Sequence, residues 1–328
     1  MNPPDPILPS SPLLDIRDLC VHIPTPGGLA RAVDGVDLRL SSGERLGLVG
    51  ESGCGKSLTA RAAIGLLPHG ARVTGRVSFD GRDTVSMPEP ERRALRGSGI
   101  AMVFQDPMTY LNPVFTVGNQ IAEALPGSIA TSERRVRVVE LLRRVRLPEP
   151  ERAATSYPWQ LSGGMRQRAL IAMAIAASPR LLIADEPTTA LDVTVQAGVL
   201  DLLDDLVRET GMSLLLISHD LGVVARVCDR VAVMYAGKII EEGTAADVLG
   251  APAHPYTRGL LTALRALDAG RVSATIPGQV HPPTNHPPGC RFHPRCRDAI
   301  ERCRNEEPTM RGIGAGRTAA CHLVECAT

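Results

Sequence analysis

The residues best suited to chemistry form the glycine-rich stretch GESGCGKS at positions 50–57. It fits the pattern G-x-x-x-x-G-K-[ST], in which backbone N–H groups wrap phosphates, the Lys56 ammonium reaches the outer phosphate oxygens and the Ser57 hydroxyl binds Mg²⁺. A glycine-rich turn could match this pattern by chance. The residues expected to contact a nucleotide here are Gly50, Glu51, Ser52, Gly53, Cys54, Gly55, Lys56, Ser57 and Leu58.

The neighbouring segments favour a phosphate site over a chance match. Residues 45–50 (RLGLVG) form a short apolar run that ends in a glycine, which predicts a strand followed by a turn. Residues 57–67 have the apolar spacing of a helix. The stretch should therefore open a helix whose positive end faces the phosphates.

Two adjacent carboxylates lie far downstream in LLIADEP. The apolar residues 181–184 predict a buried strand that ends at Asp185 and Glu186. Asp185 would then hold the Mg²⁺ shell through water, and Glu186 would polarise the water that attacks the terminal phosphate. Taken alone, the pair could equally form an exposed turn, but the phosphate loop upstream favours the catalytic interpretation.

Further motifs follow in a fixed order: Gln105 in MVFQDPMTYLNP, LSGGM at residues 161–165, TALD at residues 189–192 and His219 in LLLISHD. With the phosphate loop and LLIADEP, this order resembles that of ABC-transporter ATPases. Over nearly the whole chain it is most similar to the ATP-binding subunits of bacterial oligopeptide/dipeptide importers. The resemblance implies ATP as the nucleotide and Mg²⁺ as the metal.

The resemblance implies catalytic roles for Glu186, His219 and Gln105. Gln105 would sense the attacking water and the Mg²⁺ ion, which Ser57 and Asp185 would also hold, and it would pass this information to the membrane partner. His219 would contact the γ-phosphate. As structural alternatives, Gln105 could be a polar residue that leaves a strand, and His219 could be a satisfied histidine at a strand end.

Part of the site would come from a second subunit. The resemblance implies that Ser162 and Gly164 touch the γ-phosphate held by the opposite subunit, that Gly163 between them also binds ATP, and that Asp192 lies at the dimer seam. Ser162 could also cap a helix ahead of a flexible turn, and that role is compatible with anion binding. Each ATP would therefore lie between two chains.

The aromatic residue that usually stacks on adenine in this family is missing. Residues 19–28 contain no Phe, Tyr or Trp. Ile23 could pack on the base, and Arg31 could stack on it. Loss of stacking would weaken nucleotide binding by ~1–3 kcal/mol, if base–aromatic stacking on single strands is the guide.

Composition and charge narrow the class of protein. The chain has 328 residues, 44% of them hydrophobic, which suits an α/β domain with an appendage, and its net charge of +1 argues against a general nucleic-acid binder. The arginines of residues 132–146 alternate with apolar residues at helical spacing, so they should form the solvated face of a packed helix. No run of eighteen apolar residues and no secretion signal are present.

The expected fold class is α/β, with a mainly parallel sheet flanked by helices. The resemblance adds an antiparallel β part, an inserted helical subdomain and a small cysteine-rich tail. The predicted boundaries are a flexible N-terminus at 1–12, an ATPase domain at 13–255 with its helical subdomain at about 107–179, and a C-terminal extension at 256–328.

The C-terminal extension has two notable stretches. HPY at residues 254–256 is similar to a sequence found after the ATPase core in peptide- and nickel-type importers, although it could be a turn and a short packed helix. Residues 276–290 are rich in proline and glycine and should form an extended linker.

Cysteines cluster in the last 39 residues at Cys290, Cys296, Cys303, Cys321 and Cys326. In a reducing cytosol a metal site is a more natural interpretation than disulfides, and a metal would stabilise a tail too small for its own core. Five arginines around the first three thiols would offset the thiolate charge: Arg291, Arg295, Arg297, Arg302 and Arg304.

The spacing of these cysteines matches neither a common zinc ribbon nor the bacterial ferredoxin run. The resemblance favours a 4Fe–4S cluster on Cys290, Cys296, Cys303 and Cys321, with Cys326 spare; zinc or free thiols are the alternatives. A separate thiol, Cys54, is most simply a small residue that the loop tolerates, although its position at a predicted helix start would lower its pKa. Alkylation of Cys54 is therefore expected to block ATP hydrolysis.

These patterns predict an ATP-hydrolysing subunit that energises a membrane importer for dipeptides or oligopeptides. It would sit peripherally on the cytoplasmic face of the membrane. Its partners would be a second, homologous ATPase subunit, two transmembrane permeases and, indirectly, a solute-binding protein, with no nucleic acid. The alternatives are the same role for nickel or another small solute, a peptide-resistance system, or a soluble non-transport ABC ATPase. A P-loop kinase would lack LSGGM and His219.

Overall fold

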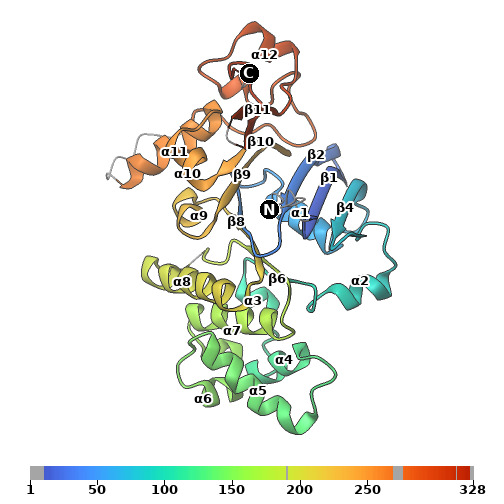
Figure 1. Ribbon diagram of the computed structural model, residues 1–328, viewed down its shortest axis with the longest axis vertical. Helices are drawn as coiled ribbons and strands as arrows, with labels where there is room; N and C mark the ends of the chain where they lie inside the picture. The colour runs from blue at the N-terminus through green and yellow to red at the C-terminus, as the bar shows by residue number, and fades with distance from the viewer. Residues whose placement is uncertain (1–10, 190, 269–275, 315, 326–328) are drawn as a thin grey trace, which may run out of the picture.

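The computed structural model describes residues 11–189, 191–268, 276–314 and 316–325. The flexible N-terminus expected at residues 1–12 lies almost entirely outside these ranges, as does Cys326. Along the longest axis, a helical group lies at one end, the sheets occupy the middle and the C-terminal segment lies at the other end (Figure 1).

The larger sheet has eight strands among the described residues, in the order β11-β12-β10-β9-β3-β8-β7-β6. The strands from β9 to β6 in this order run parallel to one another. The strand bounds are β3 (Arg45–Val49), β6 (Ile100–Val103), β7 (Leu181–Asp185), β8 (Ser213–Ser218), β9 (Arg230–Tyr235), β10 (Lys238–Thr244), β11 (Arg311–Gly314) and β12 (Arg317–Ala319).

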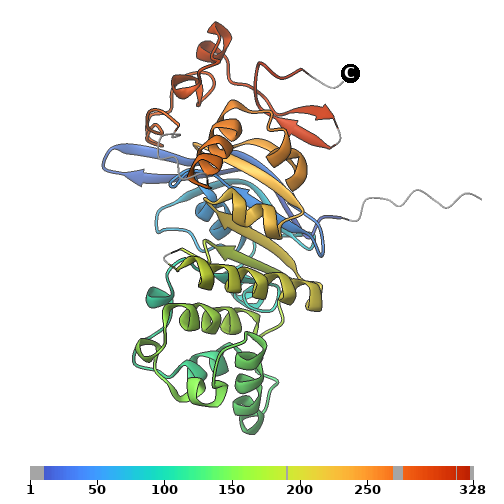
Figure 2. The same ribbon diagram turned by 90° about the vertical axis from the view of Figure 1, so that its left-hand side faces the viewer.

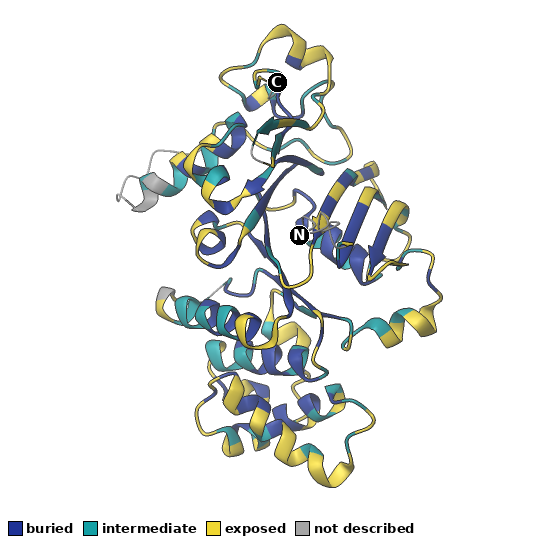
Figure 3. Ribbon diagram, viewed as in Figure 1, coloured by how far each residue is buried: buried dark blue, intermediate teal, exposed yellow. Residues whose placement is uncertain are grey.

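The centre of this sheet is covered on both faces. Every residue of β7 and β8 is buried, as expected for parallel strands between two layers (Figure 3). Alternate residues enter two different hydrophobic clusters: Leu182 packs toward the helices, whereas Ile183 packs toward the second sheet. This burial confirms the strand predicted at residues 181–184.

The second sheet is antiparallel, with the order β2-β1-β4-β5. Its strands are β1 (Leu14–Thr25), β2 (Gly28–Leu40), β4 (Arg72–Phe79) and β5 (Arg82–Asp83). Apolar residues of β1 and β2 share one hydrophobic cluster with helix α1 (Lys56–Ala63) and with strands β3, β7 and β8. Helix α1 is therefore held between the two sheets by its buried alanines.

Helices form the remaining layers. The helical group contains α3 (Pro107–Tyr110), α4 (Val117–Ala124), α5 (Thr131–Arg144), α6 (Pro150–Thr155), η1 (Pro158–Gln160) and α7 (Gly163–Ile175). Helix α2 (Glu89–Leu95) precedes β6, and α8 (Val193–Thr210), α9 (Leu221–Val227), α10 (Ala245–Gly250) and α11 (Pro255–Asp268) follow the later strands. The arginine-rich helix is present as α5, which buries Val138, Leu141 and Leu142.

The C-terminal segment lies directly on the sheets. After residues 276–290, which contain neither helix nor strand, come η2 (His293–Arg295) and α12 (Glu301–Asn305). Strand β12 then pairs with β10, where Glu241 lies opposite Ala319. The backbone N–H of Arg31, near the β1–β2 turn, donates to the Pro283 carbonyl, so this end of the hairpin lies against the C-terminal segment (Figure 2). In the described parts of the chain, each helix is too short or too polar to cross a bilayer.

Candidate functional site

The phosphate loop connects β3 to α1, as the sequence predicts. Gly55 has φ +110°, and a Cβ there would lie 2.4 Å from the Ala32 carbonyl oxygen, so both conformation and space require glycine. Ser52 and Gly53 are exposed, whereas Leu58 packs against the core between the sheets. The loop is thus anchored at its ends and open at its tip.

This loop fits the phosphates of a nucleotide. In the described structure, α1 begins after Gly55 with no side-chain cap and no acidic residue in its first turn. Its first N–H groups and its positive end therefore suit an anion. The Lys56 ammonium donates to the carbonyl oxygens of Gly50 (2.7 Å) and Glu51 (3.1 Å), which holds its charge over the loop.

Two oxygen ligands suited to Mg²⁺ meet beside the loop. The Ser57 hydroxyl donates to Asp185 Oδ1 at 2.8 Å, although the two residues are 128 positions apart. Asp185 is only 1% exposed, and burial raises its pKa, while the bond from Ser57 opposes that shift. A divalent cation would favour the charged carboxylate, so the hydroxyl and the carboxylate fit a Mg²⁺ site.

Glu186 is the centre of a second cluster. Its Oε2 accepts from Gln105 Nε2 at 3.0 Å and from the Thr189 hydroxyl at 2.9 Å, and it lies 3.3 Å from His219 Nδ1. These groups come from the ends of β6, β7 and β8, which lie side by side in the sheet. The structure therefore brings together the three residues predicted to be catalytic.

The backbone helps to aim the Glu186 side chain. Glu186 has φ +47°, an uncommon conformation for a residue other than glycine, and its N–H donates to the Ile217 carbonyl at 2.9 Å. Asp185 therefore points to Ser57 while Glu186 points to Gln105, so the adjacent carboxylates have separate partners.

The LSGGM motif lies at the start of α7, in the helical group. The Ser162 hydroxyl accepts the Met165 N–H at 3.3 Å and so caps the helix, while Ser162 and Gly163 are exposed. A Cβ on Gly164 would lie 2.5 Å from Val195 of α8. Asp192 caps α8 by accepting the Val195 N–H at 3.0 Å. Among the described residues, no hydrogen bond or ion pair joins the LSGGM motif to the phosphate loop.

The expected lowering of the Cys54 pKa is wrong. This side chain is 1% exposed, and burial raises the pKa of its thiol despite the nearby Lys56 charge. The sulfur packs into the loop, where a Cβ on Gly50 would lie 2.8 Å from it. Desolvation of the thiolate therefore outweighs the helix end, and Cys54 is a structural residue of the loop.

The tail cysteines lie near one another. Burial raises the pKa of Cys290 to about 11, and negative charge on Cys303, Cys321 and Cys296 adds to this effect. The expectation that the nearby arginines offset the charge of the thiolates is wrong for Arg291 and Arg295, because Arg291 forms an ion pair with Asp34 and Arg295 forms one with Glu51. Arg304 forms an ion pair with Glu301 within α12, and Arg302 forms one with Glu306, the residue that follows α12.

A different trio, Cys20, His22 and Asp34, has ligand atoms within 4.8 Å of one another. Although burial pushes the pKa of Asp34 upward, the Arg291 guanidinium beside it holds that pKa below its ordinary value. Cys20 Sγ accepts the Gly35 N–H at 3.2 Å. Because Asp34 already has a cationic partner, the trio fits a structural role better than a metal.

Three functional contacts were missed from the sequence. Thr189 was noted only as part of TALD, yet its hydroxyl binds Glu186. Tyr256 and Arg295 both contact Glu51 of the phosphate loop. HPY marked the position of Tyr256 without indicating a contact, and Arg295 carried no signal beyond its place among arginines.

Comparisons with known proteins agree with this geometry. The family model "ABC transporter" matches residues 33–189, and "Oligopeptide/dipeptide transporter, C-terminal region" matches residues 240–303. The chain is 50% identical to the probable peptide ABC transporter ATP-binding protein y4tR of Sinorhizobium fredii, with 94% of each chain covered. It is 48% identical to the oligopeptide transport ATP-binding protein OppD of Salmonella typhimurium, covering 95% of this chain and 94% of that one.

A solved structure extends the comparison to the fold. The dimeric, post-hydrolysis ATP-binding cassette MJ0796, bound to ADP and Pi, aligns with a TM-score of 0.64 and 28% identity. The alignment covers 71% of this chain and 98% of that one. The α/β fold predicted for the core is therefore confirmed.

Proposed function

The chain belongs to the ABC transporter family, among its oligopeptide/dipeptide ATP-binding proteins, and we propose that it is the ATP-hydrolysing subunit of a peptide importer. The observation that carries this proposal is the convergence of Gln105, Thr189 and His219 on Glu186, next to the Ser57–Asp185 pair. The names of the relatives favour peptides over nickel as cargo.

The phosphate loop would bind the nucleotide. The N–H groups at the start of α1 and the Lys56 ammonium would contact the phosphates, and Ser57 and Asp185 would hold Mg²⁺. When bound, Mg²⁺ neutralises charge that develops on the phosphates. Ile23 or Arg31 would contact the base, since no aromatic side chain is available in residues 19–28.

Glu186 would act as the base toward the attacking water. Its Oε2 faces Gln105, Thr189 and His219, so hydrogen bonds fix its direction before the reaction. His219 is 58% exposed and could reach a terminal phosphate beyond Glu186. Gln105 lies between Glu186 and the helical group, where it could report the state of the site.

The site would be completed by a second subunit. Ser162, Gly163 and Gly164 form an exposed helix start that suits an anion, although no bond joins them to the phosphate loop within the described residues. Asp192 is likewise exposed at the start of α8. A head-to-tail pair of subunits would place each LSGGM motif opposite the partner's phosphate loop, and the solved cassette MJ0796 is itself dimeric.

The permease would dock beside Gln105. A groove of about 260 Å³ is lined mainly by apolar residues of β6 and α7, together with Ile64 and Leu66, which follow α1, and Ala124 of α4. Exposed hydrophobic side chains continue along the chain from this groove at Met108, Tyr110, Val114 and Phe115. This surface suits an apolar segment of a permease and would keep the chain on the cytoplasmic face of the membrane.

The tail cysteines would hold a 4Fe–4S cluster, through Cys290, Cys296, Cys303 and Cys321. No three of them come within 4.8 Å of one another among the described residues. What supports a shared site is that Cys303, Cys321 and Cys296 lie near enough to Cys290 to affect the pKa of its thiol. Purification without oxygen should give a brown protein with iron, and a colourless, iron-free chain would refute the cluster.

Transport itself provides the test of function. The chain would be produced with its neighbouring permeases, second ATPase subunit and binding protein in cells that lack peptide uptake. We expect ATP-dependent uptake of labelled dipeptides or oligopeptides that is lost in Lys56→Ala. Uptake of nickel without uptake of peptides would favour the alternative cargo. ATP turnover that proceeds fully in a dilute, strictly monomeric preparation would refute the two-subunit site.

A further inference from the structure

The C-terminal extension binds the phosphate loop at one residue of the loop, Glu51. Arg295 Nη1 lies 2.6 Å from Glu51 Oε2, and Arg295 Nη2 lies 3.0 Å from Glu51 Oε1. Both carboxylate oxygens are therefore bound by the two ends of a planar guanidinium, which is the strongest geometry for such a pair. The two residues are 244 positions apart in the sequence.

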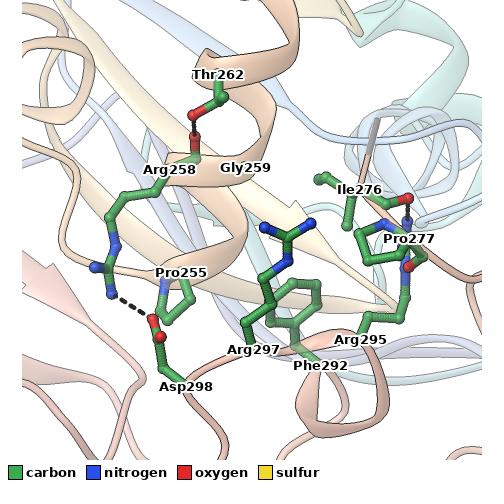
Figure 4. Close-up of a pocket in the computed structure, with 10 residues that line it drawn as sticks. All are labelled: Pro255, Arg258, Gly259, Thr262, Ile276, Pro277, Phe292, Arg295, Arg297 and Asp298. Atoms are coloured by element: carbon green, nitrogen blue, oxygen red, sulfur yellow. Dashed lines mark hydrogen bonds and ion pairs between the residues drawn. The ribbon is translucent and has the colours of Figure 1, made fainter. Parts of the chain in front are cut away.

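Arg295 is itself held in place. Its side chain is 5% exposed, and its Nε donates to the Pro277 carbonyl at 3.0 Å (Figure 4). The guanidinium also lies over the Tyr235 ring, 5.8 Å from its centre. The bond to Glu51 raises the pKa of Arg295, so the charge is permanent. A buried cation fixed on three sides presents a rigid partner to the loop.

A second group from the extension binds the Glu51 backbone. The Tyr256 hydroxyl accepts the Glu51 N–H at 2.9 Å. Tyr256 is fully buried, and its ring packs against Tyr235 and Phe292, with ring centres 4.7 and 5.5 Å away. Phe292 belongs to the same short segment as Arg295, so one aromatic cluster supports both contacts.

Glu51 also contacts the residues of the nucleotide site. Its carbonyl oxygen accepts from the Lys56 ammonium at 3.1 Å, and also from the Cys54 N–H at 3.3 Å. The carboxylate and the N–H of Glu51 thus bind the extension, while its carbonyl binds the lysine expected to contact the phosphates.

We propose that Arg295 and Tyr256 are positioning residues that hold the phosphate loop in its nucleotide-binding shape. This rests on the proposed function of that loop. With Glu51 fixed at both its side chain and its N–H, the loop loses little freedom when a nucleotide binds. Without these contacts, ordering the loop and placing Lys56 would reduce the affinity for ATP.

The test is the dissociation constant of Mg·ATP for the full-length chain, measured by calorimetry. Arg295→Gln should weaken binding about ten- to a hundredfold, as for loss of a hydrogen bond to a charged group. Tyr256→Phe keeps the buried ring and removes only the acceptor, so a loss of about fivefold is expected. This second variant remains informative if Arg295→Gln fails to fold.

Arg291→Gln is the matched control. Arg291 is a buried arginine of the same segment, but its partners are Asp34 of β2 and the Ala236 carbonyl, and not Glu51 of the loop. At equal loss of thermal stability, Arg295→Gln should weaken Mg·ATP binding more than Arg291→Gln. Equal effects of the two variants would overturn the proposal.

A double-variant cycle tests whether Arg295 affects Mg·ATP binding through Glu51 or only through the overall stability of the fold. If Arg295 acts through Glu51, adding Arg295→Gln to Glu51→Gln should have little further effect on Mg·ATP binding. Independent, multiplying losses would overturn the proposal. Failure of the wild-type chain to bind Mg·ATP, with Lys56→Ala no different from it, would instead refute the nucleotide site itself.

Discussion

His254 should make the chain sensitive to mild acid. This residue is 2% exposed, its Nδ1 accepts the Tyr256 N–H at 3.0 Å, and its own backbone N–H donates to Glu241 at 2.9 Å. Burial lowers its pKa to about 3, and the charge of Arg258 adds to this effect. The folded chain therefore keeps His254 neutral at pH values where the unfolded chain binds a proton.

The sign and size of the effect follow from these two pKa values. The unfolded value is 6.5, so His254 contributes fully to stability above that pH and loses its contribution as the pH falls toward 3. At pH 5.5 the unfolded chain is protonated at this residue about ten times more often than not, which corresponds to a loss of about 1.4 kcal/mol. At pH 7.5 the loss is below about 0.1 kcal/mol.

The assay is urea unfolding, followed by circular dichroism, at pH 7.5 and pH 5.5. The comparison variant is His254→Asn, because the amide oxygen can accept the Tyr256 N–H but the side chain does not titrate. Neighbouring groups such as Arg258 and Glu241 are unchanged, so their contributions cancel. The wild-type chain should lose about 1.4 kcal/mol more than the variant between the two pH values. Equal losses would refute the burial of a neutral histidine here.

Four further perturbations test the site and the proposed docking surface. Glu186→Gln should slow phosphate release from ATP by about 10²–10⁴-fold with Mg·ATP still bound, since the amide cannot take a proton; unchanged turnover would contradict its role as base. Gly55→Ala should lower the melting temperature and abolish Mg·ATP binding in calorimetry, because its Cβ would lie 2.4 Å from a backbone oxygen; normal binding would contradict the loop geometry. Cys54 should resist iodoacetamide at pH 8 until the chain is unfolded, as read by mass spectrometry; fast labelling of the native chain would show the thiol to be accessible. Phe115→Asp should reduce co-purification of the permeases without changing Mg·ATP binding by the isolated chain; full recovery would remove this surface from the docking site.

Local sequence signals predicted the elements well where burial and periodicity agree. The apolar run 181–184 became β7, and α8 ends at Thr210, just before Gly211 at φ +68°. Such signals act over a few residues, because strand alternation, helix spacing and a glycine after the last turn are local properties. The proximity of Gln105, Glu186 and His219 could also be predicted from the sequence, because parallel strands place their carboxyl ends at one edge of the sheet.

The errors concern burial of single side chains. The hypothesis of a lowered pKa for Cys54 rested on its position at a helix start, but the folded loop turns its sulfur inward and burial raises its pKa. The arginines near the tail cysteines were expected to face the thiols, but Arg291 and Arg295 point to Asp34 and Glu51 instead. Sequence proximity shows which charges are available, and only the packing decides which of them pair.

Glu51 shows why the link between the extension and the loop escapes a sequence pattern. The phosphate-loop motif permits any residue at this position, so nothing in it requires a carboxylate. The partners lie 205 and 244 positions downstream, beyond the reach of any local periodicity. Yet a buried arginine without Glu51, or a Glu51 N–H without Tyr256, would leave a polar group unpaired at a cost of about 1–3 kcal/mol. That cost ties the two parts together: a change in the C-terminal extension that moves Arg295 must also disturb the loop that binds the phosphates.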